Sequence, residues 1–389
     1  MVALSRRVQG FTESVIREMT RVVTQYGGVN LAQGMPNFPP PAELIEAAHR
    51  AIDGDFHQYA ITWGAPALRQ AIADRYRTLY GLEVDPEREV TVCCGSTETM
   101  LSTLLAVLNP GDQVIVFEPF YENYGPGCLI AGAEPVFVPL EPPTFGFDPD
   151  RLRAAVTPRT RALIFNSPNN PTGKVFSRAE LEVIADLCRT HDLVAVTDEI
   201  YEHIVYDGRA HVPIATLPGM AERTVTISGL SKTYSVTGWR IGWAVAPPAL
   251  TLGIRRAHDF VTVGAPHPLQ AAAVAALRLP ETYYTWLRQT YQAKRDLLLG
   301  YLRPAGFTAW TPEGAYYVLT DVADLLRRHR VADDTAFAMF LVKEVGVATV
   351  PGSSFYAHPD LGRTKIRFCF PKTDEVLREA GERLQKLRG

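Results

Sequence analysis

Short runs of apolar residues alternate with longer helical stretches through the central part of the chain. The runs are rich in Val, Ile, Ala and Phe, and their length is typical of strands. We predict strands at residues 90–93, 114–117, 162–165, 194–197, 224–227 and 241–245. Apolar strands separated by helices indicate a parallel or mixed sheet that is covered on both faces. The pattern therefore predicts a layered α/β domain.

Both ends of the chain show helical periodicity. Phe11, Val15, Met19 and Val22 recur at helical spacing and predict an opening amphipathic helix. The C-terminal third predicts a long helix, three strands and a final helix, at residues 281–302, 315–319, 345–350, 365–370 and 376–387. We expect a large domain and a discontinuous small domain, with bounds at residues 46–289 for the first and 1–45 with 290–389 for the second.

Composition and charge exclude several classes of protein. Hydrophobic residues make up 47% of the 389 residues, which is enough for a large core and argues against disorder. A net charge of −3 offers no basic field for nucleic acid. The apolar runs are far shorter than the roughly 18 residues needed to span a bilayer. No signal peptide is recognisable, so we expect a cytoplasmic protein without nucleic-acid or membrane partners.

The five cysteines and nine histidines show no metal-binding or disulfide pattern. There is no CxxC pair and no HExxH sequence among them. We therefore expect neither a disulfide framework nor a metal site.

Polar residues and turn formers follow directly on five of the predicted strands. In open α/β sheets, ligands bind in the crevice outside the carboxyl ends of the strands. One candidate site is therefore expected from residues 95–97, 118–121, 166–173, 198–201 and 228–232.

Three of these strand ends carry chemically distinctive residues. Ser96 and Thr97 precede a helical run, where free N–H groups bind anions, although an ordinary N-cap is the alternative. Asp198 ends a buried strand and needs a partner there, either a structural arginine or a cationic ring nitrogen of a cofactor. Lys232 lies among small residues, where desolvation would lower its pKa and make it a Schiff-base nucleophile. Arg240 is expected to meet an anion.

Several separated motifs, taken together, resemble the class I and II aminotransferases of the fold type I pyridoxal-phosphate enzymes. They follow the family's order over nearly the whole chain, and they comprise residues 170–173, Asp198 with Tyr201, residues 229–232 with 235–236, 238 and 240–242, and residues 366–368. The nearest branch is that of the glutamine, kynurenine and methionine transaminases. The resemblance implies a large domain with a mostly parallel, seven-stranded sheet between helices, together with a smaller α+β domain.

The resemblance also implies roles around pyridoxal 5′-phosphate. Lys232 is expected to hold this cofactor as an internal aldimine and to act as the general base. Asp198 should pair with the pyridinium nitrogen, so that the ring acts as an electron sink. Tyr201 and Asn170 should hydrogen-bond the phenolic oxygen of the ring, and Tyr121 should stack on its face.

Further positions are expected to hold the phosphate and to bridge two subunits. Ser96, Thr97 and Arg240 should bind the phosphate. Tyr59 should reach the phosphate of a neighbouring subunit, which implies a homodimer with shared active sites. The chain departs from the family at Gly229, where many relatives carry a serine, and Ser231 or Ser228 is expected to supply the missing hydroxyl.

The amino acid substrate is expected to be held by residues from both ends of the chain. Arg367 should bind its carboxylate as a bidentate fork. Gly34 should approach through its backbone, with Tyr124 and Asn170 beside it. The side-chain pocket is expected from Met35, Phe38, Tyr124 and residues 263–266, which would make it apolar or aromatic. An acidic substrate would need a further arginine, and the sequence identifies none.

These residues predict an aminotransferase that moves an amino group from an L-amino acid to a 2-oxo acid. The donor is expected to have a neutral, apolar or aromatic side chain. The alternative is a pyridoxal-phosphate-dependent carbon–sulfur β-lyase that acts on cysteine conjugates, because it uses the same motifs. A non-catalytic, regulatory cofactor-binding module is a third reading.

Overall fold

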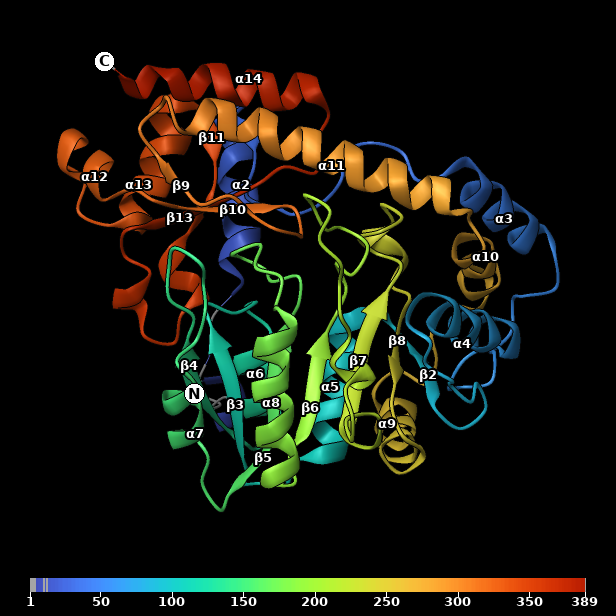
Figure 1. Cartoon of the computed structure of the whole chain (residues 1–389). Coiled ribbons are helices and arrows are strands. Elements are labelled where there is room, and N and C mark those ends of the chain that lie inside the picture. Colours follow the sequence, from blue (N-terminus) through green and yellow to red (C-terminus); the bar gives the residue numbers. More distant parts are fainter. Residues whose placement is uncertain (1–4, 10, 12, 389) are drawn as a thin grey trace.

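A seven-stranded sheet forms the centre of the computed structural model, which describes residues 5–9, 11 and 13–388 (Figure 1). The strand order is β2-β8-β7-β6-β5-β3-β4. Every neighbouring pair from β7 to β4 is parallel, whereas β8 is antiparallel to both of its neighbours. The strands are β2 (Val90–Cys93), β3 (Gln113–Glu118), β4 (Glu134–Pro139), β5 (Thr160–Asn166), β6 (Val194–Asp198), β7 (Thr224–Gly229) and β8 (Gly242–Val245). The predicted mostly parallel α/β sheet is confirmed.

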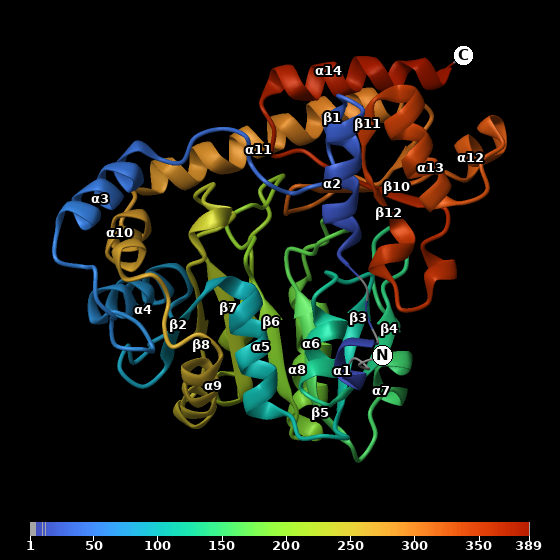
Figure 2. The ribbon, with the colours of Figure 1, turned by 180° about the vertical axis from the view of Figure 1, so that it is seen from behind.

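Helices cover both faces of this sheet because its strands send apolar side chains to both sides. In β3, Ile115 and Phe117 pack in one cluster with α8, and Val114 and Val116 pack in another with α5. Figure 1 shows α8 in front of the sheet, and Figure 2 shows α5 and α9 in front of the opposite face. The bounds are α5 (Gly95–Val107), α8 (Arg178–Thr190) and α9 (Pro248–Val261).

Other helices pack along the rim and at the β2 end of the sheet. Helix α10 contacts both α3 and α4 at the β2 end (Figure 1). These helices are α1 (Arg6–Gln9), α3 (Ala42–Asp53), α4 (Pro66–Tyr80), α6 (Tyr124–Ile130), α7 (Pro149–Ala154) and α10 (His267–Leu277), whereas α2 (Val15–Gln25) packs against β11 and β12 of the C-terminal region. Helix α2 begins at Val15, so Phe11 precedes the opening helix instead of belonging to it. No helix among the described residues is long and apolar enough to cross a membrane.

The C-terminal third builds a smaller, four-stranded antiparallel sheet with the order β12-β13-β10-β9. Its strands are β9 (Thr308–Ala309), β10 (Tyr317–Asp321), β12 (Val350–Pro351) and β13 (Lys365–Cys369), and the helices around it are α11 (Glu281–Leu302), α12 (Ala323–His329), α13 (Asp334–Phe340) and α14 (Asp374–Leu384). The long helix predicted at 281–302 is confirmed as α11. The single strand predicted at 345–350 is wrong, because β11 (Val347–Ala348) and β12 are separated at Thr349 and join different sheets.

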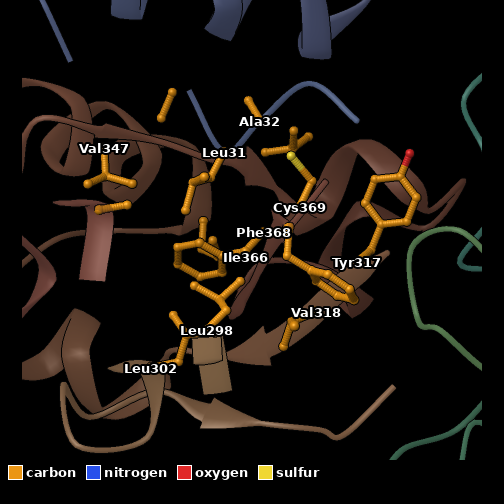
Figure 3. Packing of buried hydrophobic residues seen from close by; sticks show 14 of the residues in the cluster. Leu31, Ala32, Leu298, Leu302, Tyr317, Val318, Val347, Ile366, Phe368 and Cys369 are labelled. Atoms are coloured by element: carbon orange, nitrogen blue, oxygen red, sulfur yellow. The ribbon is translucent and has the colours of Figure 1, made fainter. Parts of the chain in front are cut away.

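The N-terminal segment packs into the core of this C-terminal region. Strand β1 (Val29–Asn30) pairs in parallel with β11. Figure 3 shows Leu31 and Ala32 close to Ile366 and Phe368 of β13, with Leu298 of α11 below them. The first and last parts of the chain therefore share one apolar core. The division into domains at residues 45 and 290 stays a prediction, and α3 runs across the first of these boundaries.

Candidate active site

A cavity of about 330 Å³ opens at the carboxyl ends of the central strands, beneath the N-terminal segment. Strand ends β5, β6 and β7 and the first turn of α5 supply one part of its lining, and residues before α3 supply another. The structure brings most of the predicted site residues together there, namely Gly34, Ser96, Thr97, Tyr121, Asn170, Asp198, Tyr201, Ser231, Lys232 and Arg240. Arg367, Tyr124 and Tyr59 are placed elsewhere.

The inner end of the cavity is built to receive an anion. Ser96 and Thr97 lie in the first turn of α5, whose free N–H groups and dipole favour negative charge. The Arg240 guanidinium joins them and donates to the carbonyl of Thr237 at 3.0 Å. This approach needs Gly95, because a Cβ there would lie 2.5 Å from an Nη atom of Arg240. Gly95 also has a φ of +79°, which side chains disfavour.

A buried ion pair supports the first turn of α5 from behind. Glu98 accepts from the backbone N–H of Cys94 at 2.9 Å and contacts His258 Nδ1 at 3.1 Å. Together with Cys93, this pair forms the one group of possible metal ligands among the described residues. The Ser102 hydroxyl also donates to Glu98, so its carboxylate oxygens already have donors. We interpret the group as a structural support for the helix.

Asp198 and Lys232 face the middle of the cavity from neighbouring strand ends. The Tyr124 hydroxyl donates to Asp198 Oδ2 at 2.7 Å, and the Ile200 N–H donates to Oδ1 at 3.2 Å. Burial raises the pKa of Asp198 even though both donors stabilise its anion. Burial and the nearby Arg240 lower the pKa of Lys232 to about 8, against the opposing effect of Asp198. A larger fraction of Lys232 is therefore neutral and nucleophilic near neutral pH.

The departure at Gly229 has a steric reason. A Cβ at this position would lie 2.7 Å from the carbonyl oxygen of Ile241 and 3.0 Å from Cα of Gly242. Strands β7 and β8 approach too closely here for a serine. Ser228 donates to Glu202 at 2.7 Å, whereas Ser231 lines the cavity. Ser231 and Ser228 were both expected as candidates for the missing hydroxyl, and only Ser231 lies at the cavity.

A group of tyrosines closes one wall of the cavity. The hydroxyls of Tyr201 and Tyr317 lie 2.9 Å apart, and Tyr316 donates to the Gly34 carbonyl at 2.8 Å. A Cβ on Gly34 would lie 2.1 Å from the Tyr317 hydroxyl, so the close contact requires glycine. Sequence reasoning missed Tyr317. The only local signal was the pair of adjacent tyrosines, Tyr316 and Tyr317, within the predicted strand at residues 315–319.

Arg367 lies behind the cavity wall, where it is 1% exposed. One Nη donates to Asn170 Oδ1 at 2.9 Å and the other to the Ala32 carbonyl, while its guanidinium stacks on Tyr317 at 4.4 Å. Its Nε is buried and has no hydrogen-bond partner among the described residues. The guanidinium is therefore fixed in place with donor capacity left over.

The side-chain pocket differs from the sequence-based expectation. Met35 lines the cavity, but Phe38 packs on Tyr291 of α11 at 5.9 Å between ring centroids. Tyr124 is buried beneath Asp198, because its hydroxyl is the donor to that carboxylate. An arginine that the sequence did not reveal, Arg17 of α2, lines the outer end. Sequence order hides this contact, since α2 is far from the strand ends along the chain.

Tyr59 and residues 263–266 lie together outside the cavity. Tyr59 is 85% exposed, and its neighbour Gln58 accepts from His267 at 3.0 Å. Thr62 of the same segment accepts from His258 at 2.9 Å. The expectation that residues 263–266 line the pocket of their own chain is therefore wrong.

Comparison with known proteins identifies the family. The family model described as Aminotransferase class I and II matches residues 26–384. A probable N-succinyldiaminopimelate aminotransferase, DapC, of Mycobacterium tuberculosis is 41% identical over 98% of each chain. Human kynurenine–oxoglutarate transaminase 1 is 37% identical over 98% of this chain and 97% of its own. The structure of YbdL from Escherichia coli, for which a methionine aminotransferase function is described, has a TM-score of 0.94 and 32% identity, covering 99% of this chain and 100% of the other.

The chain therefore belongs to the class I and II aminotransferases. It is an aminotransferase, and enzymes of this class act on an amino acid and a 2-oxo acid. The family uses pyridoxal phosphate. The resemblance inferred from the separated motifs is confirmed over the whole length that they span.

Proposed function

We propose that the cavity binds pyridoxal phosphate and that the enzyme moves the amino group of an L-amino acid with a neutral, apolar or aromatic side chain to a 2-oxo acid. The observation that carries this proposal is the position of Lys232. It is a half-buried lysine with a lowered pKa, placed between a buried carboxylate and an anion-binding helix terminus. A lysine in this setting is suited to covalent attachment of a carbonyl compound.

The residues around the cavity fit this cofactor in charge and in shape. The first turn of α5 with Arg240 suits a phosphate, and Ser231 adds a hydroxyl at the same end. Asp198 is a buried carboxylate held by two neutral donors, so a cationic ring nitrogen would stabilise its charge. Tyr121, Tyr201 and Asn170 line the same cavity. We infer that Tyr121 would cover a face of the ring and that Tyr201 and Asn170 would hydrogen-bond its phenolic oxygen.

The proposed mechanism assigns proton transfer to Lys232. When bound, pyridoxal phosphate supplies an electron-withdrawing ring that makes the α-proton of an amino acid acidic. Lys232 Nζ takes that proton as a general base and later returns it, which its pKa of about 8 permits near neutral pH. Asp198 would hold a proton on the ring nitrogen through its negative charge. Tyr124, although it does not line the cavity, orients the Asp198 carboxylate through its 2.7 Å hydrogen bond.

The substrate carboxylate is proposed to bind near Asn170 and Arg367. The Arg367 guanidinium is held rigidly by Tyr317 and Phe355, on which it stacks at 4.4 and 4.8 Å. A substrate carboxylate would accept hydrogen bonds from the Arg367 guanidinium, next to the Ala32 carbonyl that this guanidinium already contacts. The apolar side chains in the mostly polar lining of the cavity include Ile16, Met35, Tyr121 and Tyr317. Relatives named for kynurenine and methionine support a donor side chain that fits such walls.

A homodimer with shared active sites is part of the proposal. Tyr59 and Ile61 are exposed beside α9, where Phe260 is 95% exposed and Val263 is also exposed. Such a group of exposed apolar side chains is typical of a protein interface. In the dimer, Tyr59 would reach the phosphate site of the partner. The expected cytoplasmic location stays a prediction.

Substitution of Lys232 tests the proposed function most directly. In Lys232→Ala, we expect turnover to fall by roughly 10⁴-fold or more, because both proton transfer and covalent attachment are lost. The measurement is the visible absorption of the cofactor-loaded protein before and after a single amino acid is added without a 2-oxo acid. Lys343→Ala is the control, since Lys343 is exposed and does not line the cavity.

The same experiment separates the alternatives. Retained turnover in Lys232→Ala would contradict the assignment. Release of pyruvate and ammonia from a cysteine conjugate without a 2-oxo acid would favour the β-lyase, which the relatives named as aminotransferases do not favour. A protein that binds no pyridoxal phosphate after reconstitution would overturn the cofactor assignment.

A further inference from the structure

A buried carboxylate at the end of β3 plays no part in the proposed chemistry. Glu118 is the last residue of this strand and is 1% exposed. The donors that the structure describes for its side chain come from one distant part of the chain: the Ala357 N–H at 2.9 Å, the His358 N–H at 3.4 Å and His358 Nδ1 at 2.8 Å. A buried carboxylate without donors is strongly unfavourable. These contacts therefore hold residues 352–358, which we call the 352–358 segment, against the end of β3.

The 352–358 segment also touches the group that is proposed to bind the substrate carboxylate. Phe355 is fully buried, and the Arg367 guanidinium lies over its ring at 4.8 Å from the centroid. The Phe355 carbonyl accepts from the Phe120 N–H at 2.9 Å. Tyr121, the next residue, lines the cavity. One segment therefore connects the end of β3, the cavity wall and Arg367.

The two ends of the 352–358 segment are held differently. At its start, the Ser353 N–H donates to Asp334 Oδ2 at 2.7 Å, within the C-terminal region. At its other end, residues 357–361 are exposed, so burial of their own side chains contributes little to their position. Glu118 ties this exposed end to the central sheet. Loss of its carboxylate would free the exposed end to shift, and Phe355 with it.

We propose that Glu118 is a positioning residue, which sets the Arg367 guanidinium for the substrate carboxylate by holding the 352–358 segment on the central sheet. This inference rests on the proposed function, in which Arg367 binds that carboxylate. The position of such a group matters, because a displacement of about 1 Å can cost about 100-fold in rate. Glu118 does not line the cavity, so it acts through Phe355.

Two probes that differ at one end report on Arg367 without any reaction. 3-Phenylpropionate and 3-phenylpropanamide share a stem and end in a carboxylate and a neutral amide, and neither carries an α-amino group. The measurement is the dissociation constant of each probe for the cofactor-loaded protein, by isothermal titration calorimetry. Thermal unfolding and the affinity for pyridoxal phosphate are measured beside it. We expect the wild-type protein to prefer the carboxylate, because a guanidinium matches its two oxygens.

Glu118→Leu removes the acceptor and keeps a side chain of similar size. We expect its affinity for 3-phenylpropionate to fall about tenfold. Its affinities for the amide and for pyridoxal phosphate should stay within about twofold. An equal fall for both probes would show a general structural role and overturn the inference. An unchanged affinity for 3-phenylpropionate would overturn it with the proposed function intact, whereas a wild-type protein that prefers neither probe would overturn the proposed carboxylate site itself.

Substitutions of His358 provide the same test if Glu118→Leu does not fold, because the His358 side chain is 67% exposed. A carboxylate only accepts hydrogen bonds, so His358 Nδ1 is the donor. His358→Leu should weaken 3-phenylpropionate binding about threefold, since the two backbone donors remain. His358→Asn offers an amide donor near the position of Nδ1 and should restore the affinity. His49→Ala is the control, since His49 is exposed and does not line the cavity. Equal affinities in the two His358 variants would overturn the inference.

Discussion

The two ends of the cavity are built in different ways. The inner end consists of strand ends and the first turn of α5, all of which belong to one continuous sheet and its covering helix. The outer end is formed by α2 and the segment after it, which approach from the C-terminal core, together with Glu122. Met19 and Val23 of α2 are buried in that core.

This difference suggests that the residues of the reaction and the residues that choose the donor lie at different ends of the cavity. On the proposed function, groups at the inner end, such as Asp198 and Lys232, would meet the part that every donor shares, so changes there should affect all donors alike. Groups at the outer end would meet the donor side chain and should affect donors unequally. The predictions that follow test the inner half of this comparison.

After Lys232→Ala, the largest effect is expected from Asp198→Asn. The substitution keeps the shape but removes the buried negative charge, so turnover should fall by roughly 10²- to 10³-fold for every donor. Tyr124→Phe removes the 2.7 Å hydrogen bond but keeps the charge, and it should cause a smaller loss. Steady-state rates with one aliphatic and one aromatic amino donor are the measurement. Loss for one donor alone would break the distinction between the two ends.

The next effect concerns the pH dependence of stability in the cofactor-free protein. The pKa of Lys232 is about 8 when folded, and its ordinary value is 10.5. The unfolded chain therefore binds more protons between these values, so this residue makes the free energy of unfolding rise with pH across that window. The total rise is at most about 3 kcal/mol.

Lys232→Met should remove this rise, because methionine is neutral at every pH. Urea unfolding of wild-type and Lys232→Met protein from pH 7 to pH 10 provides the measurement, and the difference between the two curves isolates the residue. Parallel curves would mean that Lys232 is not desolvated and that the inner end is more open to water than the structure indicates.

The smallest effect is expected from Gly95→Ala. A Cβ would displace the Arg240 guanidinium, which lies within 2.5 Å of its position, and should weaken cofactor binding about tenfold. Gly111→Ala is the matched control. Gly111 also has a positive φ, of +90°, but a Cβ added there would have no atom within 4 Å. Titration of both variants with pyridoxal phosphate should show weaker binding only in Gly95→Ala. Equal binding would contradict an anion site at this turn.

Much of the fold could be read from local patterns, and the exceptions have physical reasons. Continuous apolar runs marked six of the seven central strands because both of their faces are buried. Strand β4 was missed because it lies at the sheet edge, is partly exposed and contains two prolines. Strands β11 and β12 looked like one strand because burial makes both equally apolar.

Local order along the chain was enough to place the inner end of the site. Ser96, Asp198 and Lys232 each follow directly on a strand, and parallel strands bring their carboxyl ends to one edge of the sheet. The outer end needed the folded chain. Arg17 and Tyr317 reach the cavity because α2 and β10 belong to the C-terminal core, which packs over the strand ends. Contacts between segments distant in sequence depend on packing, which periodicity does not record.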